Sequence, residues 1–166
     1  DGKEKVPFDR LLIATGALAL IPPIPGIESE RVVGLRTLAD ADRIIALARG
    51  TGRSVVIGGG YIGLEAAYAL RRLGLEVIVL EMMPHLLYAN LDETAAGLIA
   101  QDLSAERIAI RTGQGNQVTR IEESSGTLRL SLRSEQTLIS LSMPQECKQT
   151  LDWFRAPPSA QPSVCW

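Results

Sequence analysis

An apolar run that leads directly into a glycine-rich turn constrains the fold of this 166-residue chain more than any other feature. Residues 54–57 are typical of a buried strand, and the turn that follows has the spacing G-x-G-x-x-G. Its three glycines are Gly58, Gly60 and Gly63. A helical pattern then extends to Gly74, and a second apolar run over residues 75–80 ends at Glu81. Strand, tight turn, helix, strand and acid follow one another in this order in a dinucleotide-binding βαβ unit.

Each glycine of this turn has a physical reason. Gly58 permits the tight turn, Gly60 lets the backbone approach a pyrophosphate that a Cβ would meet, and Gly63 lets the helix pack closely on the strand. The helix offers free N–H groups and the positive end of its dipole to the phosphates. We therefore expect the cofactor to bind at six consecutive residues, namely Gly58, Gly59, Gly60, Tyr61, Ile62 and Gly63. The alternative is a βαβ unit whose glycines serve only packing.

The acid at the end of the second strand predicts which dinucleotide binds. A carboxylate at Glu81 can accept hydrogen bonds from the ribose 2′-hydroxyl of NAD, whereas it would repel the 2′-phosphate of NADP. A bound 2′-phosphate would also need a nearby cation, and residues 82–85 contain no arginine or lysine. The sequence therefore favours NAD over NADP.

The remaining pattern predicts an α/β fold, in which a Rossmann-like parallel sheet with helices is followed by a small antiparallel three-stranded annex. Two further helices are expected, one from Thr37 to Gly50 with Asp40 in an approximate capping box, and one from Asp92 to about Glu106. The other expected strands, of which the first is expected to be buried, cover residues 11–14, 31–35, 108–110, 118–122, 127–132 and 137–141. The proline-rich residues 22–26 are predicted to form a stiff connector.

Composition excludes several other classes of function. The net charge of −2 gives no sign of a partner such as nucleic acid or an anionic membrane. The apolar stretch over residues 17–27 is too short and too interrupted by prolines to span a bilayer. Cys147 and Cys165 form no disulfide framework, so a cytoplasmic location is expected. His85, the single histidine, is interpreted as a solvated loop residue, and no metal site is predicted.

Several motifs together resemble the pyridine nucleotide–disulfide oxidoreductases. Residues 8–16 resemble the segment that closes the first half of the FAD domain in this family, and residues 22–26 resemble the connector that follows. Leu35, Arg36 and Thr37, with the acidic residues after them, are similar to the helix start before the NAD domain. The motif over residues 58–65, GGGYIGLE, is similar to the second nucleotide fingerprint. The branch that contains NADH oxidase, CoA-disulfide reductase, nitrite reductase and rubredoxin reductase looks most similar.

The resemblance implies a flavoprotein in which NAD(P)H donates hydride to FAD, and FAD passes electrons to a disulfide, oxygen or a redox protein. It implies that Thr15 and Gly16 lie near FAD, that Tyr61 gates the pocket between flavin and nicotinamide, and that Glu65 approaches the nicotinamide side from the first turn of the helix. Each assignment has a structural alternative. Thr15 and Gly16 would form an ordinary turn at a strand end, Tyr61 would pack within the loop, and Glu65 would complement the helix dipole.

The chain also departs from the family pattern. The first glycine fingerprint, the redox-active cysteines, the later FAD motif and the domain that pairs subunits in a homodimeric parent are all missing, and a truncated or frame-shifted sequence is one explanation. We expect three parts: residues 1–52 with a partial FAD-domain strand, the connector and a helix; residues 53–141 with the NAD-binding domain; and residues 142–166 as a divergent, irregular tail. No catalytic residue and no role for Cys147 or Cys165 is assigned.

Three hypotheses about function follow. The first is the NAD-binding module of an FAD-dependent oxidoreductase, inactive in isolation because most of a FAD site is missing. The second is a non-catalytic NAD-binding or interaction module. The third is an autonomous NAD-dependent dehydrogenase, for which no catalytic acid or base constellation appears after Glu81.

Overall fold

The computed structural model describes residues 5–134 and 138–142, and it contains two three-stranded sheets. The first sheet is parallel, in the order β1-β2-β3, and the second is antiparallel, in the order β4-β5-β6. The strands are β1 (Arg53–Ile57), β2 (Glu76–Leu80), β3 (Ile108–Arg111), β4 (Val118–Ser124), β5 (Thr127–Leu132) and β6 (Leu138–Ser142). The helices are α1 (Leu38–Ala48), α2 (Tyr61–Arg72), α3 (Glu93–Ala105) and a 3₁₀ turn, η1 (Gln114–Asn116). The predicted α/β fold with its antiparallel annex is therefore confirmed.

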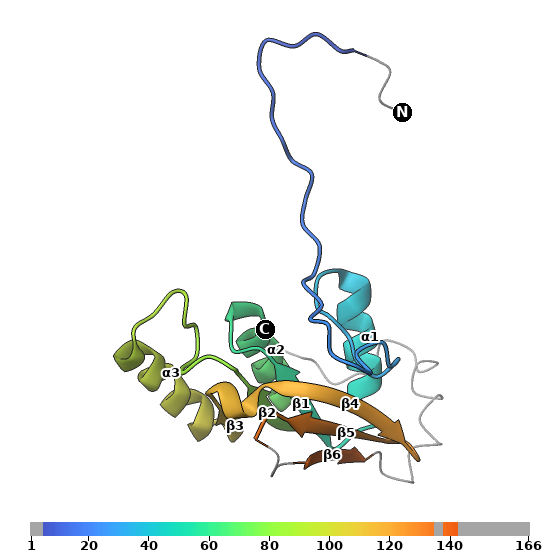
Figure 1. The fold of residues 1–166 in the computed structure, drawn as a ribbon, viewed down its shortest axis with the longest axis vertical. Coiled ribbons are helices and arrows are strands. Elements are labelled where there is room, and N and C mark those ends of the chain that lie inside the picture. Colours follow the sequence, from blue (N-terminus) through green and yellow to red (C-terminus); the bar gives the residue numbers. More distant parts are fainter. Residues whose placement is uncertain (1–4, 135–137, 143–166) are drawn as a thin grey trace, which may run out of the picture.

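The βαβ unit is built as the apolar pattern requires. β1 pairs in parallel with β2 from Arg53 opposite Glu76 to Ile57 opposite Leu80, and α2 crosses between the two strands (Figure 1). Parallel strands are covered on both faces and therefore carry nearly continuous apolar runs. In β2, Val77 and Val79 are almost fully buried against the helices, while Leu80 is buried on the side of the second sheet.

The three helices begin in two different ways. Thr37 accepts a hydrogen bond from the backbone N–H of Asp40, whose carboxylate accepts one from the backbone N–H of Thr37, so the predicted capping box starts α1. Asp92 accepts from the backbone N–H of Ala95 at the start of α3. α2 begins at Gly60, which has no side chain to cap it. Its first N–H groups therefore remain available to a ligand.

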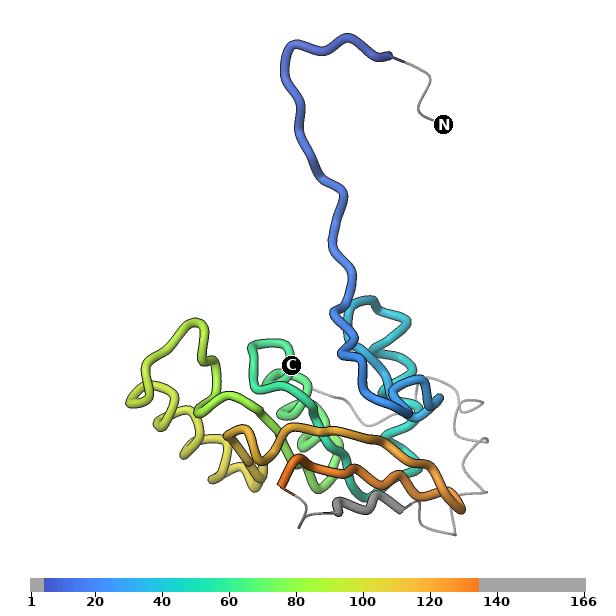
Figure 2. Tube along the Cα trace, viewed as in Figure 1, coloured from blue at the N-terminus to red at the C-terminus, as the bar shows by residue number. Residues whose placement is uncertain are grey.

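Two predicted strands are wrong. Residues 11–14 form no strand but belong to an extended arm, residues 5–21, that projects from the body of the protein (Figures 1 and 2). Leu12 and Ile13 in this arm are 87% and 75% exposed. An apolar run becomes a buried strand only beside another strand, and no sheet edge within the described residues reaches the arm. Residues 31–35 are likewise irregular, because they pass over the first sheet without joining its ladder.

The connector is part of the body rather than a free spacer. The backbone N–H of Ile121 in β4 donates to the carbonyl of Pro25, and a Cβ on Gly26 would overlap the carbonyl oxygen of Ile121. Ile24 and Ile27 pack against the buried cluster of the second sheet. Close backbone approach at Gly26 therefore joins the connector to β4.

The predicted tail, residues 142–166, lies outside the described residues except for Ser142, which ends β6. Within the described residues, no helix is both long and apolar enough to cross a membrane.

Candidate dinucleotide-binding site

The glycine loop between β1 and α2 is held in a conformation that side chains would prevent. Gly58 has a φ of 110°, in the region that favours glycine, and its N–H donates to the carbonyl of Leu80 at 2.8 Å. A Cβ on Gly63 would overlap the carbonyl oxygen of Gly58 and would lie 3.5 Å from a methyl group of Val56. Gly58 and Gly63 thus allow the tight turn and the close packing of α2 on β1 that the sequence predicts.

Gly60 has open space where a side chain would stand. Its φ of −82° and ψ of 177° are accessible to any residue, and no atom of the described residues lies within 4 Å of the position that a Cβ would take. Nothing in the fold itself therefore requires glycine at this position. A ligand that approaches the backbone here is a physical reason for the absence of a side chain.

Gly59 is fixed by the loop that follows β2. Its N–H donates to Oε2 of Glu81 at 2.6 Å, and its carbonyl accepts from the N–H of Leu87 at 2.9 Å. A Cβ on Gly59 would lie 2.7 Å from a methyl group of Leu86, which is almost fully buried. Sequence reasoning missed these two leucines. The sequence signal that could have indicated their burial is that they form an apolar pair inside a segment otherwise typical of a turn.

Glu81 connects the ends of β1 and β2. Its Oε1 accepts from the backbone N–H of Met83 at 2.7 Å, and its Oε2 accepts from Gly59. The carboxylate is half-buried beside the glycine loop, so the structure brings together the predicted ribose acid and the predicted phosphate loop. Each carboxylate oxygen has a further lone pair that can accept from a ribose hydroxyl.

The residues predicted at the nicotinamide side are exposed at the start of α2. Tyr61 and Ile62 are 58% and 57% exposed. Glu65 is also exposed, but it is the fifth residue of the helix and lies in its second turn, so its predicted place in the first turn is wrong.

Thr15 and Gly16 are exposed and belong to the arm, residues 5–21, which projects from the body of the protein (Figure 2). Gly16 has a φ of 76°, and no atom of the described residues lies within 4 Å of the position that its Cβ would take. The described residues therefore do not assemble a site that fits FAD around these two positions.

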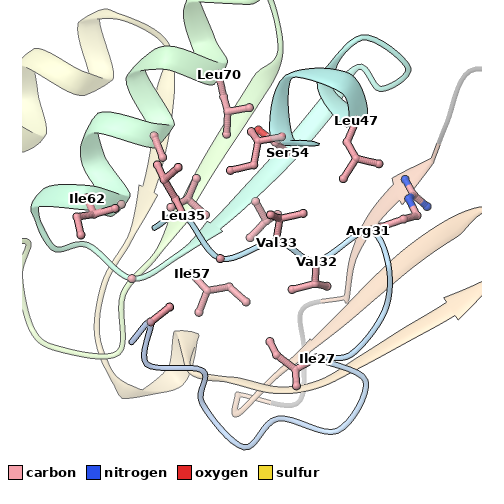
Figure 3. A pocket seen from close by; sticks show the side chains of 18 of the residues that line it. Ile27, Arg31, Val32, Val33, Leu35, Leu47, Ser54, Ile57, Ile62 and Leu70 are labelled. Carbon is pink, nitrogen blue, oxygen red and sulfur yellow. The ribbon is translucent and has the colours of Figure 1, made fainter. Parts of the chain in front are cut away.

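A cavity of about 680 Å³ runs from the glycine loop along β1 (Figure 3). Residues 31–35, the helices α1 and α2, and the strands β4 and β5 form its walls. Its lining is mostly apolar, with Arg31 and Arg53 as the charged exceptions. Glu81 and Glu65 do not line it, so the predicted ribose acid lies outside this cavity.

His85 is half-buried rather than solvated as predicted. Its Nδ1 lies 2.9 Å from the carbonyl oxygen of Leu86, and its ring centroid lies 4.9 Å from that of Tyr88. No group of three or more potential metal ligands occurs within the part of the chain that the structure describes.

The βαβ unit and its glycine loop define the class of the protein, which is that of the Rossmann-like α/β proteins. Residues 1–143 match the model of one family within this class, described as pyridine nucleotide-disulphide oxidoreductase. The chain belongs to this family, as its motifs predicted.

Proteins of known activity share part of their length with this chain. The nitrite reductase [NAD(P)H] large subunit of Klebsiella oxytoca is 39% identical over 131 residues, which are 79% of this chain and 14% of that subunit. The water-forming NADH oxidase of Lactobacillus brevis, solved with bound NADH, has a TM-score of 0.70 and 27% identity, over 77% of this chain and 28% of the oxidase. An NAD-dependent persulfide reductase from A. fulgidus has a TM-score of 0.66 and 39% identity, over 71% of this chain and 22% of the reductase. The chain thus spans only a minor part of each relative.

Proposed function

We propose that this chain is the NADH-binding module of an FAD-dependent oxidoreductase. The parent enzyme would pass hydride from NADH to FAD, and electrons then to a disulfide, oxygen or a redox protein. The open space at Gly60, next to the uncapped start of α2, is the observation that carries the proposal. It is supported by family membership and by the NADH bound to the oxidase of Lactobacillus brevis.

The residues of this chain fit a nicotinamide dinucleotide. Backbone N–H groups of Tyr61, Ile62 and Gly63, which have no acceptor within the helix, would donate to the pyrophosphate at the positive end of the α2 dipole. The remaining lone pairs of the Glu81 carboxylate would accept from the ribose hydroxyls and disfavour a 2′-phosphate. When bound, NADH supplies the hydride, and the protein orients it. Tyr61 and Glu65 remain the candidates for contact with the nicotinamide side.

FAD belongs to the proposed parent rather than to this chain. Thr15 and Gly16 lie on the exposed arm with no described residue packed around Gly16, so they do not hold a flavin by themselves. Hydride transfer requires both cofactors to be held in one geometry. The proposal therefore includes the expectation that the module is inactive in isolation. It also includes a homodimeric parent and, on cysteine usage alone, a cytoplasmic location.

Calorimetric titration of the purified chain with NADH, NADPH and FAD tests the proposal. We expect NADH to bind more tightly than NADPH, and FAD not to bind. No binding of either nicotinamide dinucleotide to the folded chain would overturn it.

Gly60→Val is the variant that tests the site. It should abolish NADH binding while the helix content stays normal, because the side chain meets ligand and not protein. The matched control is Gly52→Val, at an exposed glycine just before β1 that also has no atom within 4 Å of its Cβ position. This control should bind NADH normally, and equal loss in both variants would contradict the assignment.

A further inference from the structure

Leu87 holds a backbone conformation that leucine rarely adopts. Its φ of 51° lies in the left-handed region, where a side chain crowds the backbone. Such outliers persist only where the surrounding structure fixes them, and they concentrate at functional sites. Leu87 lies beside the glycine loop, because its N–H donates to the carbonyl of Gly59. The unusual conformation therefore occurs at a contact with the proposed dinucleotide site.

Both backbone polar groups of Leu87 are used. Its N–H donates to the carbonyl of Gly59 at 2.9 Å. Its own carbonyl accepts from the N–H groups of Asn90 and Leu91, at 2.8 and 3.0 Å, and so closes a turn over residues 87–91. The hydrogen bond to Gly59 therefore comes from a turn that is itself held by hydrogen bonds.

The side chains of Leu86 and Leu87, which we call the leucine pair, anchor this turn in the core. They are 1% and 6% exposed, and they belong to the buried cluster that contains Leu64 and Ala67 of α2. A methyl group of Leu86 takes up the space that a Cβ on Gly59 would need, 2.7 Å from that position. Core packing at the leucine pair is therefore linked to the position of Gly59 by a side-chain contact and by a backbone hydrogen bond.

The carbonyl of Gly59 and the N–H of Gly60 belong to one peptide group. Within the described residues no peptide bond is cis, so this carbonyl and this N–H point in opposite directions. The hydrogen bond from Leu87 to the carbonyl therefore directs the N–H of Gly60 away from the turn over residues 87–91. Among the described residues, the N–H of Gly60 has no hydrogen-bond acceptor. The leucine pair thus fixes the direction of a donor that the described part of the fold does not use.

We propose that the leucine pair is a positioning element of the dinucleotide site, which sets the peptide between Gly59 and Gly60 so that the N–H of Gly60 donates to the pyrophosphate. This inference rests on the proposed function, because it concerns the same site. A donor that is already held in place needs no reordering when the anion binds, so more of the energy of its hydrogen bond contributes to affinity. Both leucines act through Gly59 and need no contact with the dinucleotide.

NADH titration of Leu86→Ala, at a temperature where circular dichroism shows a folded chain, tests the proposal. The affinity should fall by about tenfold or more, because the peptide loses its support and with it one hydrogen bond to a charged group. The matched control is Ile108→Ala, since Ile108 is also 1% exposed and belongs to the same buried cluster, but lies at the start of β3. This control should also destabilise the fold and yet keep the NADH affinity of the unchanged chain. Equal losses of affinity in the two variants would show a general effect of core packing and overturn the proposal.

A double variant tests whether Leu86 acts through Gly59. The φ of Gly59 lies outside the region that favours glycine, so Gly59→Ala is limited by space and not by backbone conformation. Its new methyl group would meet Leu86 and should weaken NADH binding. Adding Leu86→Ala vacates that space and should recover part of the affinity, because Cβ and Cγ of Glu81 remain 3.1 and 3.2 Å from the new methyl group. Losses that simply add would contradict a positioning role for Leu86.

An NMR measurement without ligand separates this proposal from the proposed function. The scalar coupling across the hydrogen bond, between the backbone nitrogen of Leu87 and the carbonyl carbon of Gly59, should be present in the unchanged chain and in Ile108→Ala, and lost in Leu86→Ala. Its absence from the folded, unchanged chain would overturn the positioning role, whether or not NADH binds. A chain that shows the expected couplings but binds no NADH would overturn the proposed function, while the fixed direction of the peptide would remain supported.

Discussion

α1 and α2 begin in opposite ways. At the start of α1, the side chains of Thr37 and Asp40 accept hydrogen bonds from backbone N–H groups within a capping box. At the start of α3, the side chain of Asp92 accepts from the backbone N–H of Ala95. At the start of α2, Gly60 provides no side-chain cap, and the carboxylate of Glu81, just after β2, accepts from the N–H of the preceding Gly59. The comparison teaches that side chains cap the first turns of α1 and α3, whereas the first turn of α2 has no side-chain cap and is where the proposed ligand would bind.

The largest effect is expected where α2 packs on β1. Gly63→Ala should lower the free energy of unfolding by about 3 kcal/mol or more, because the new methyl group overlaps the carbonyl of Gly58. Chemical denaturation followed by circular dichroism measures this loss. Gly97→Ala, at a glycine inside α3 with no atom within 4 Å of its Cβ position, is the control and should stabilise the chain by about 0.5–1 kcal/mol. Similar stability of the two variants would show that α2 is not held against the strand.

A second prediction converts the open helix start into a capped one. Gly60→Asp should raise the stability of the folded chain by a few tenths of a kcal/mol, because aspartate caps a helix better than glycine does. The same carboxylate should weaken NADH binding by several kcal/mol, because it stands against the pyrophosphate. Thermal unfolding and calorimetry measure the two effects. Gly60→Asn caps without a charge, so it should weaken binding less. Undiminished NADH affinity in Gly60→Asp would contradict the binding of the pyrophosphate at the start of α2.

Glu81 tests whether the carboxylate beside α2 serves the ligand. Glu81→Ala should weaken NADH binding by about 1–3 kcal/mol, because it removes the acceptor of the ribose hydroxyls and of the N–H of Gly59. Glu81→Gln keeps one acceptor oxygen and removes the charge, so the preference for NADH over NADPH should shrink. Calorimetry with both dinucleotides measures these changes. Unchanged NADH affinity in the alanine variant would reject the assignment.

The smallest effect is expected at the start of α1. Thr37→Ala should lower the free energy of unfolding by about 1 kcal/mol and leave NADH affinity unchanged, because this cap serves only its own helix. Urea denaturation and the NADH titration together check both statements. A loss of NADH affinity would show that the two helix starts are coupled.

The pH dependence of stability provides a related check on α1. Hydrogen bonds from the backbone and the hydroxyl of Thr37, and from the backbone of Arg36, lower the pKa of Asp40 below its usual 3.8. A carboxylate with a lowered pKa contributes stability that is present above pH 3.8 and is lost as the pH falls through its lower value in the folded protein. Asp40→Asn should therefore reduce the loss of stability in acid. An unchanged acid profile would show that the capping box does not form in solution.

The sequence by itself determined the βαβ unit, the caps at Thr37 and Asp92, and the antiparallel annex. These features depend on the spacing of apolar residues, on capping side chains and on glycines within one short segment. A local pattern is therefore enough to predict them. It also determined the open helix start at Gly60, because the absence of a capping side chain can be read directly from the residue type.

Only the tertiary structure decided what lies next to these elements. The N–H of Gly59 donates to Glu81 and its carbonyl accepts from Leu87, and these hydrogen bonds join residues from different parts of the chain, so no local pattern reports them. The failure of residues 11–14 and 31–35 to form strands has the same cause. A strand is stabilised by hydrogen bonds to a neighbour, and apolar spacing predicts the capacity to pair but does not supply the partner.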